Sequence, residues 1–308
     1  MKRFASIDIG STSILLLILE NSNGIRTLLE RAEIANLGSD LEKTGTIREN
    51  NISLAVHILT DFIKDCQSYN VPEENIIITG TEILRTANNT NEFLEIIKRK
   101  FNSVIRILTG EEEATYSYFG QMIERENVSK KIAVLDIGGG STEISAGIEG
   151  ELIYNHSMKI GARRITNKFF VNDPPLQTEI QNAKDFIIDS FSVLDFDFDS
   201  YELVGVASTV TTACTVLLEI PDWQPELVHN RVLTIDRIQH LVELYSKLNI
   251  NRKKEIVGLD PERASIILGG TMILHLFMDF FKIEKIKVST KGLRYGILFQ
   301  EFNKRLPD

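Results

Sequence analysis

The chain has 308 residues, of which 43% are hydrophobic and 25% charged, so it is long enough to bury two hydrophobic cores. Its formal net charge of −9 argues against a general nucleic-acid-binding surface. The longest apolar run, Ile14 to Leu19, is far too short to span a membrane, and the N-terminus lacks the apolar core of a signal peptide. With only Cys66 and Cys214 and no CxxC pair, we expect a cytoplasmic protein.

Strands and helices alternate along the first half of the chain. An apolar strand is expected over residues 3–9, followed by two more strands in SILLLILE and GIRTLLERAEI. Apolar residues at helical spacing predict a helix over residues 50–69. The remaining elements expected in this half are a strand at 75–81, a helix at 91–101, a strand at 104–108 and a helix from Glu111.

The same order of elements then begins again. An apolar strand at 131–137 ends in Asp-Ile like the first strand, and EISAGIEGELIYNHS again contains two strands, joined at Glu149-Gly150. The later elements expected are helices at 162–170 and 176–194, a strand at 201–207, helices at 208–217 and 261–281, a strand at 285–290 and a closing helix.

This restart predicts a duplicated α/β domain with mixed sheets, because chance would not repeat a whole element order. We place the first domain at residues 1–124 and the second at 125–308, with the boundary in the polar stretch 123–129. The closing helix, at about 294–308, is expected to pack back on the first domain.

Each domain opens with a glycine- and hydroxyl-rich hairpin, DIGSTS at residues 8–13 and DIGGGSTE at residues 136–143. Glycines there permit positive φ and let backbone N–H groups approach an anion, and serine and threonine add donors. Two hairpins facing one another would hold a polyphosphate from both sides of a cleft. The predicted phosphate-binding residues are Gly10, Ser11, Thr12, Ser13, Gly138, Gly139, Gly140, Ser141 and Thr142.

Carboxylates at the ends of these hairpins are candidate magnesium ligands, since phosphate sites commonly need a divalent metal held by oxygen. Asp136 and Glu143 lie at either end of the second hairpin, and Asp8 occupies the matching place in the first. We therefore expect Mg²⁺, with Mn²⁺ as the alternative. For Glu143 an ordinary solvated position on a strand is the competing interpretation.

Several ordered motifs resemble the exopolyphosphatase and guanosine pentaphosphate phosphohydrolase (Ppx/GppA) family, within the actin, sugar-kinase and heat-shock-chaperone superfamily. They are DIGSTS, TGTEILRTANN at 79–89, TGEEEA at 109–114, DIGGGSTE, GVASTVTT at 205–212, VHNRVLT at 228–234 and VSTKGLRYGIL at 288–298. The resemblance implies two actin-like (ribonuclease H-like) domains with an interdomain cleft. Since the chain ends near the limit of that core, it is similar to the short, two-domain members.

The resemblance also implies roles for individual residues. Glu113 matches the glutamate taken as the general base, with Glu112 as the second choice in the same motif. Arg85 matches the Leu-Arg position, where a planar and permanently charged guanidinium suits a terminal phosphoryl group. Thr209 in GVASTVTT is a further candidate for phosphate binding, and His229 is of weaker interest.

The chain departs from the family pattern at five positions. Thr115 replaces an arginine, Ser208 a glycine and Leu15 a basic residue. Thr290 and Tyr295 stand where acidic residues are common. The other histidines show no zinc-ligand spacing, and neither a P-loop nor a GxSxG elbow is present.

The sequence thus predicts a metal-assisted exopolyphosphatase that releases orthophosphate from inorganic polyphosphate, acting as a monomer or homodimer without nucleic-acid or membrane partners. Three alternatives stay open. Guanosine penta- or tetraphosphate is the alternative ligand, a phosphotransferase resembling sugar kinases would share the fold, and a non-catalytic sensor of polyphosphate or an alarmone would share the binding site.

Overall fold

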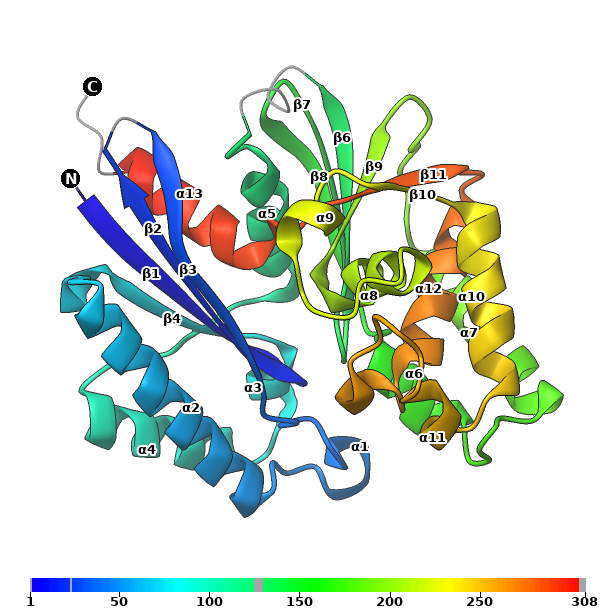
Figure 1. Cartoon of the computed structure of the whole chain (residues 1–308), viewed down its shortest axis with the longest axis horizontal. Coiled ribbons are helices and arrows are strands. Elements are labelled where there is room, and N and C mark those ends of the chain that lie inside the picture. The colour runs from blue at the N-terminus through cyan, green and yellow to red at the C-terminus, as the bar shows by residue number, and fades with distance from the viewer. Residues whose placement is uncertain (1, 23, 125–129, 305–308) are drawn as a thin grey trace. The chain divides into compact units, whose positions relative to one another are not determined.

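The computed structural model describes residues 2–22, 24–124 and 130–304. The chain forms two compact units, the first comprising Met1–Arg125 and Leu293–Asp308 and the second Glu126–Gly292 (Figure 1). The boundary expected at 123–129 falls mainly on residues 125–129, which lie outside the described residues. Each unit contains α/β structure built on a mixed sheet, which confirms the predicted fold class.

The sheet of the first unit has the strand order β3-β2-β1-β4-β5. β1 pairs antiparallel with β2 and parallel with β4, so the sheet is mixed. Its strands are β1 (Lys2–Ile9), β2 (Ser13–Asn21), β3 (Ile25–Ile34), β4 (Ile76–Gly80) and β5 (Arg106–Ile107).

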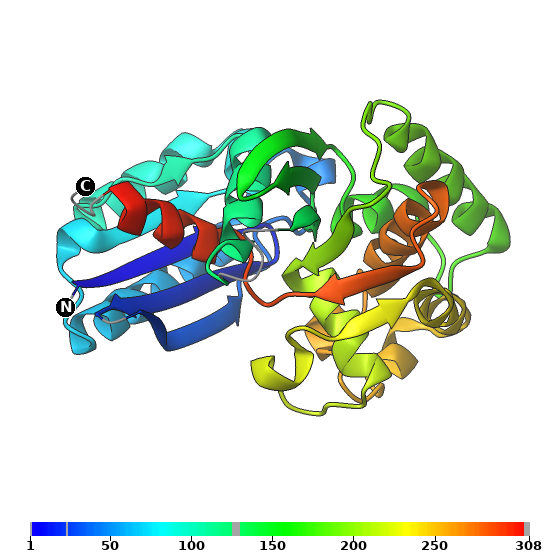
Figure 2. The ribbon, with the colours of Figure 1, turned by 90° about the horizontal axis from the view of Figure 1, so that it is seen from above.

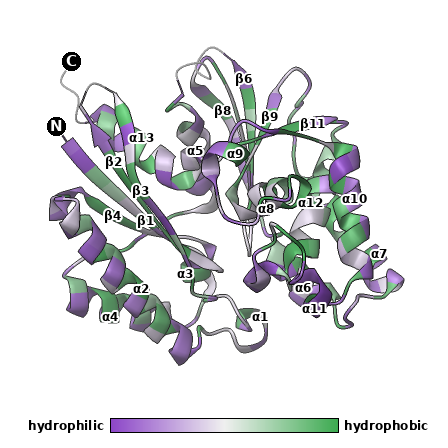
Figure 3. Cartoon of the chain, in the orientation of Figure 1, coloured by the Kyte–Doolittle hydropathy of each residue, from purple (hydrophilic) through white to green (hydrophobic). Residues whose placement is uncertain are grey.

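Helices cover both faces of this sheet, because β1 and β2 together carry buried apolar residues on both sides. Ala5, Ile7 and Ile9 belong to a core with α2 and α4, whereas Phe4 packs on the opposite face with α13. In Figure 3, α2 and α4 each carry a hydrophobic and a hydrophilic side. The helices are α1 (Leu41–Thr44), α2 (Glu49–Ser68), α3 (Glu82–Thr86), α4 (Thr90–Phe101), α5 (Gly110–Gln121) and α13 (Leu293–Lys304), with a 3-10 turn at Glu73–Asn75.

Helix α13 follows the second unit in the chain but packs in the first. Figures 1 and 2 both show it beside β1 and β2, and it also contacts α5. Its side chains are fixed by polar contacts as well as by the core. Arg294 Nη1 donates to Leu16 O at 2.6 Å, and the buried Tyr295 hydroxyl donates to Glu30 Oε1 at 2.6 Å. Residues 305–308 of the expected helix lie outside the described residues.

The second unit repeats the opening topology of the first. Its sheet order is β10-β11-β9-β6-β7-β8, so that β8-β7-β6-β9 corresponds to β3-β2-β1-β4. The parallel pairing of β6 with β9 again follows an antiparallel three-strand meander. Its strands are β6 (Lys131–Ile137), β7 (Thr142–Ile148), β8 (Glu151–Met158), β9 (Glu202–Val206), β10 (Val232–Thr234) and β11 (Lys285–Val288). The repeated strand order supports the predicted duplication.

One large core joins a face of this sheet to the helices of the second unit, and Leu135 and Ile137 of β6 are fully buried in it. Helix α12 is apolar on nearly all sides because it lies within that core. The helices are α6 (Ala162–Phe169), α7 (Gln177–Phe191), α8 (Ala207–Leu217), α9 (Pro225–Val228), α10 (Ile235–Lys247), α11 (Ile250–Lys253) and α12 (Ile267–Phe280).

Two predicted elements are shorter than expected. The strand predicted at 104–108 is reduced to β5, since Val104 is exposed and only Arg106 and Ile107 pair with β4. The helix predicted from 261 begins at Ile267, because Pro261–Arg263 forms a separate 3-10 turn capped by the Asp260 carboxylate. Within the described ranges, no helix is long and apolar enough to cross a membrane.

Candidate active site

The two glycine-rich hairpins close their turns in the same way. Gly10 N donates to Ser13 O at 3.0 Å, and Gly138 N donates to Ser141 O at 3.0 Å. A Cβ on Gly138 would lie only 3.2 Å from Ser141 O, which explains the glycine at this position. Glycine would permit positive φ in these turns, but none of their glycines is among the residues with positive φ. Close backbone approach, rather than left-handed geometry, accounts for Gly10 and Gly138.

The second hairpin (residues 136–143) lies on the N-terminus of α6. Ala162 N donates to Gly138 O at 2.9 Å, Arg163 N donates to Gly139 O at 2.8 Å, and Arg164 Nε donates to Gly140 O at 2.9 Å. The C=O and N–H of a trans peptide point to opposite sides. The N–H groups that follow these three carbonyls, those of Gly139, Gly140 and Ser141, therefore point away from α6. This arrangement is suited to binding an anion.

The first hairpin (residues 8–13) is held in the same manner by the loop after β3. Gly38 N donates to Ser11 O at 2.8 Å, and Ala35 N and Asn36 N donate to Thr12 O at 3.0 and 2.9 Å. The N–H groups of Thr12 and Ser13 accordingly face away from that loop. Each unit thus presents consecutive backbone donors at the turn after its first strand.

Three of the predicted phosphate-binding hydroxyls donate to protein acceptors. Ser11 Oγ donates to Glu82 Oε2 at 3.3 Å, Thr142 Oγ1 to Ile160 O at 2.7 Å and Thr209 Oγ1 to Ile137 O at 3.1 Å. A hydroxyl carries a single proton, so these three fasten the hairpins in this structure. Backbone N–H groups are therefore the stronger candidates for phosphate binding.

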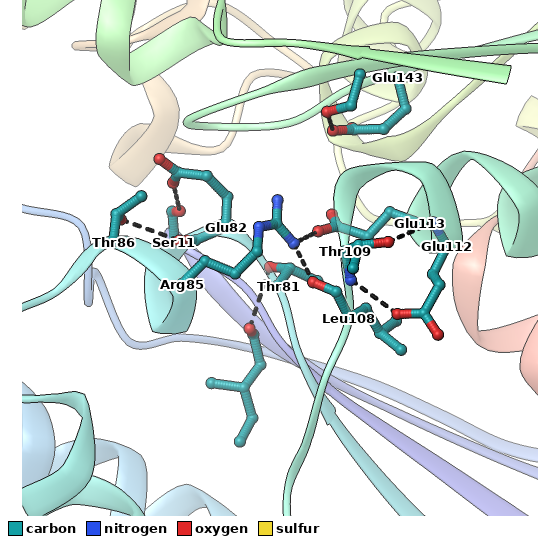
Figure 4. Close-up of polar contacts among 12 residues, drawn as sticks. Ser11, Thr81, Glu82, Arg85, Thr86, Leu108, Thr109, Glu112, Glu113 and Glu143 are labelled. Carbon is teal, nitrogen blue, oxygen red and sulfur yellow. Dashed lines mark hydrogen bonds and ion pairs between the residues drawn. The ribbon is translucent and has the colours of Figure 1, made fainter.

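Asp136 and Glu143 are directly opposite one another in the β6–β7 ladder. Side chains in such a pair lie on one face of the sheet, with Cβ atoms about 4.5–5.5 Å apart. Glu143 is buried and accepts a hydrogen bond from Ser157 Oγ at 2.8 Å (Figure 4). Asp8 is also buried, but its ladder partners in the first unit are Leu15 and Thr79. Only the second hairpin therefore combines two carboxylates.

The carboxylates of Asp136 and Glu143 suit a magnesium ion better than they suit a metal ion whose ligands all come from the protein. Across the described residues, no group of three or more His, Cys, Asp or Glu side chains is placed to hold a metal ion. Magnesium usually keeps several waters and takes one or two carboxylates together with phosphate oxygens. Asp136 and Glu143 supply that number, so the residues fit a largely hydrated ion.

In the first unit, Arg85 and Glu113 form an ion pair. Arg85 is on α3 and Glu113 is in the first turn of α5, and Arg85 Nη1 donates to both Glu113 Oε1 and Leu108 O (Figure 4). Glu113 is buried, with 8% of its surface exposed, whereas the Arg85 side chain keeps 24%. A buried carboxylate beside a more exposed guanidinium can accept a proton while the cation holds an anion.

Glu112, the neighbouring carboxylate, performs a different task. Its Oε2 accepts from Thr109 N at 2.8 Å, while Glu112 N donates to Thr109 Oγ1 at 3.1 Å, which completes a capping box. Its Oε1 accepts from Arg106 at 2.5 Å. Although partial burial acts against it, these contacts lower the pKa of Glu112. Both carboxylate oxygens of Glu112 are thus used in contacts at the start of α5.

His229 contacts the segment that follows β11. Its Nδ1 accepts a hydrogen bond from Thr290 N at 3.2 Å, so the two positions noted in the sequence are neighbours in the second unit. Of the other departures from the family pattern, Thr115 donates to Glu111 O at 2.7 Å within α5, and Tyr295 binds Glu30. Thr115 and Tyr295 are uncharged, so neither side chain supplies the charge that the family pattern has at its position.

Arg106 and Ser157 are among the residues that contact predicted site residues and that sequence reasoning missed. Counting back from the Glu149-Gly150 turn would pair Glu143 with His156. A register shift after Ala146 moves the pairing to Ser157. Gly147, a glycine inside the strand, is the sequence signal for that bulge, and Arg106, three residues before the TGEEEA motif, was available as a lone cation near three glutamates.

Comparison with known proteins adds curated relatives. The chain is 34% identical over 307 residues to the bifunctional 3-dehydroquinate synthase/phosphatase of Fusobacterium nucleatum, covering 96% of this chain and 46% of that protein. It is 26% identical to the putative exopolyphosphatase of Haemophilus influenzae, covering 97% and 91%. It is also 26% identical to the guanosine-5'-triphosphate,3'-diphosphate pyrophosphatase of Vibrio parahaemolyticus, covering 96% and 59%. The chain therefore spans about half the length of the first of these relatives.

A solved structure and a family model extend the agreement over nearly the whole chain. The crystal structure of the Aquifex aeolicus Ppx/GppA family member matches with a TM-score of 0.85 and 29% identity, covering 100% of this chain and 99% of that one. The model of the Ppx/GppA phosphatase family matches residues 17–305. The resemblance found in the sequence motifs is confirmed, and the chain belongs to the Ppx/GppA phosphatase family.

Proposed function

We propose that this phosphatase hydrolyses the terminal phosphoanhydride bond of inorganic polyphosphate and releases orthophosphate. The ion pair of Arg85 with the buried Glu113 carries the proposal. It joins a carboxylate that can accept a proton from water to a cation suited to phosphoryl oxygens.

In the proposed reaction, oxygens of the terminal phosphoryl group take the place of Glu113 on the Arg85 guanidinium. Glu113 then accepts a proton from a water molecule whose oxygen attacks the terminal phosphorus. The bond from that phosphorus to the bridging oxygen breaks, and the bridging oxygen stays with the shortened chain and takes up a proton. Arg85 neutralises the charge on the transferring group, which is the main catalytic requirement of phosphoryl transfer.

Backbone donors hold the phosphate groups in this proposal. Gly139, Gly140 and Ser141 of the second hairpin, and Thr12 and Ser13 of the first, direct consecutive N–H groups away from the elements that fix their carbonyls. Asp136 and Glu143 would hold magnesium, which when bound neutralises phosphate charge and orients its oxygens. Ser157 fixes the Glu143 carboxylate through its 2.8 Å hydrogen bond, and so limits the directions from which that carboxylate would bind the magnesium ion.

Guanosine pentaphosphate is the second candidate substrate, because a similar relative is named a guanosine-5'-triphosphate,3'-diphosphate pyrophosphatase. The reaction at phosphorus would be the same. The cytoplasm is the compartment we propose for either reaction.

The test is orthophosphate release from four substrates: long-chain polyphosphate, tripolyphosphate, guanosine pentaphosphate and ATP, each with and without magnesium. We expect magnesium-dependent release that is fastest from polyphosphate. Faster release from guanosine pentaphosphate would transfer the assignment to the alarmone. If none of the four yields orthophosphate while polyphosphate still binds, the protein is a sensor and the hydrolase assignment is wrong.

A further inference from the structure

A second arginine lies on the other side of the first turn of α5. Arg106 is at the start of β5, three residues before the Thr109 cap, and its guanidinium contacts two side chains of the helix. Nη2 donates to Glu112 Oε1 at 2.5 Å, and Nη1 donates to the Tyr116 hydroxyl at 2.8 Å. The guanidinium carbon is also 5.6 Å from the centroid of the Tyr116 ring.

These contacts fix the rotation of α5 about its own axis. Glu112 and Tyr116 are four residues apart, so they lie on the same face of the helix, one turn from each other. Glu113 is the next residue and projects about 100° away around the axis, toward Arg85. A helix held at Glu112 and Tyr116 therefore presents Glu113 in one direction only.

Both anchoring side chains are themselves fixed. Tyr116 is buried in a cluster with Leu108, Leu293 and Ile297. Glu112 uses its second oxygen on the backbone N–H of Thr109. Arg106 thus links the start of β5, the helix cap and the α13 interface.

An ion pair this exposed would ordinarily contribute little. The side chains of Arg106 and Glu112 keep 50% and 36% of their exposure, and such pairs contribute at most about 1 kcal/mol. Here one guanidinium makes an ion pair, a hydrogen bond to the hydroxyl of a buried tyrosine and a cation–π contact with the ring of the same residue, so one ordered side chain makes three contacts. These contacts favour a role for Arg106 in positioning α5 over a role in stabilising the protein as a whole.

We propose that Arg106 is a positioning residue, which acts through Glu112 and Tyr116 to orient the Glu113 carboxylate for the attacking water. The inference rests on the proposed phosphatase function, because its kinetic effect requires Glu113 to be the base. Arg106 itself does not touch the reacting atoms.

A double-mutant cycle on turnover tests the coupling. We expect Arg106→Gln to lower kcat about tenfold with KM within twofold of wild type, since small displacements of a reacting group slow chemistry more than binding. Glu112→Gln retains the cap, because glutamine also serves at this position, but removes the charge that Arg106 binds. The double variant should therefore be no slower than the slower single variant.

Two further variants separate positioning from loss of fold. Arg106→Lys keeps a positive charge beside Glu112 but loses the planar guanidinium that reaches Tyr116, so its kcat should lie between those of Arg106→Gln and wild type. Arg99→Gln removes the same charge from the exposed end of α4 and should change nothing. A kcat for Arg106→Gln within twofold of wild type, or single effects that multiply in the double variant, would overturn the proposal.

Amide hydrogen exchange tests whether Arg106 holds α5 without a measurement of turnover. In Arg106→Gln, exchange at residues 112–114 should accelerate about tenfold, and in Arg99→Gln it should not. Unchanged exchange overturns the role of Arg106 even if the wild-type protein is active. Conversely, a wild-type protein that releases no orthophosphate refutes the proposed function, and accelerated exchange would still establish that Arg106 holds α5.

Discussion

Replacing Arg85 by alanine should affect stability and catalysis together. The variant removes the cation beside Glu113 and the hydrogen bond to Leu108 O. Breaking a fully buried ion pair costs about 3–5 kcal/mol and an exposed one about 0–1 kcal/mol. With side-chain exposures of 24% and 10%, this pair lies between the two limits, so we expect a loss of about 2 kcal/mol.

The catalytic loss should be larger. A donor that stabilises charge in the transition state contributes about 10²–10³ in kcat. We therefore expect orthophosphate release by Arg85→Ala to fall at least 100-fold or so, measured at saturating polyphosphate.

A matched double variant separates the two effects. Arg85→Met combined with Glu113→Gln removes both charges, and calorimetry should show a smaller loss of stability than in Arg85→Ala. Its turnover should remain as low as that of either single variant. An Arg85→Ala protein with an unchanged melting temperature and turnover within threefold of wild type would refute the reasoning.

Three further predictions concern other parts of the molecule. Tyr295→Phe removes the hydroxyl that donates to Glu30, and calorimetry should show a loss of about 2 kcal/mol, as for a hydrogen bond to a charged acceptor; a neutral result would mean that this hydrogen bond does not stabilise the packing of α13. The pKa of Glu112 is lowered from 4.5, so its contribution to stability is present above that pH and is lost as the pH falls through the lower folded value. As the pH is lowered, the free energy of unfolding should therefore fall less steeply in Glu112→Gln than in wild type. Identical curves for the two proteins would contradict this. Asp136→Asn should raise the magnesium concentration for half-maximal turnover about tenfold, and an unchanged requirement would remove Asp136 from the metal site.

Much of the fold was predictable because its strands carry strong local signals. β1 and β6 are short apolar runs that end in Asp-Ile-Gly, and the two strands after each are separated by clear turns. Helix α2 showed its apolar stripe in sequence and is confirmed within one residue at each end. By contrast, α10 and β10 were not predicted, since the segment that contains them was interpreted only through its VHNRVLT motif.

The candidate site was predictable as a set of residue types but not as a set of contacts. The motifs identified Glu113 and Arg85 separately, and only the fold brings α3 and α5 together so that they pair. Glycine patterns suggested anion binding, which stays a prediction, and the structure shows that Gly10 and Gly138 closely approach Ser13 O and Ser141 O. Contacts that depend on register or on strand ends, such as that of Ser157 with Glu143, require the structure.

Turnover of Glu113→Gln is the most direct measurement of the central claim. Glutamine keeps the shape of the side chain and a hydrogen-bond acceptor for Arg85 but cannot accept the proton of water. Orthophosphate release from polyphosphate should fall by about 10²–10⁴, the usual contribution of a general base, while polyphosphate affinity stays within about threefold of wild type. Release within tenfold of wild type would contradict the assignment of Glu113 as the base.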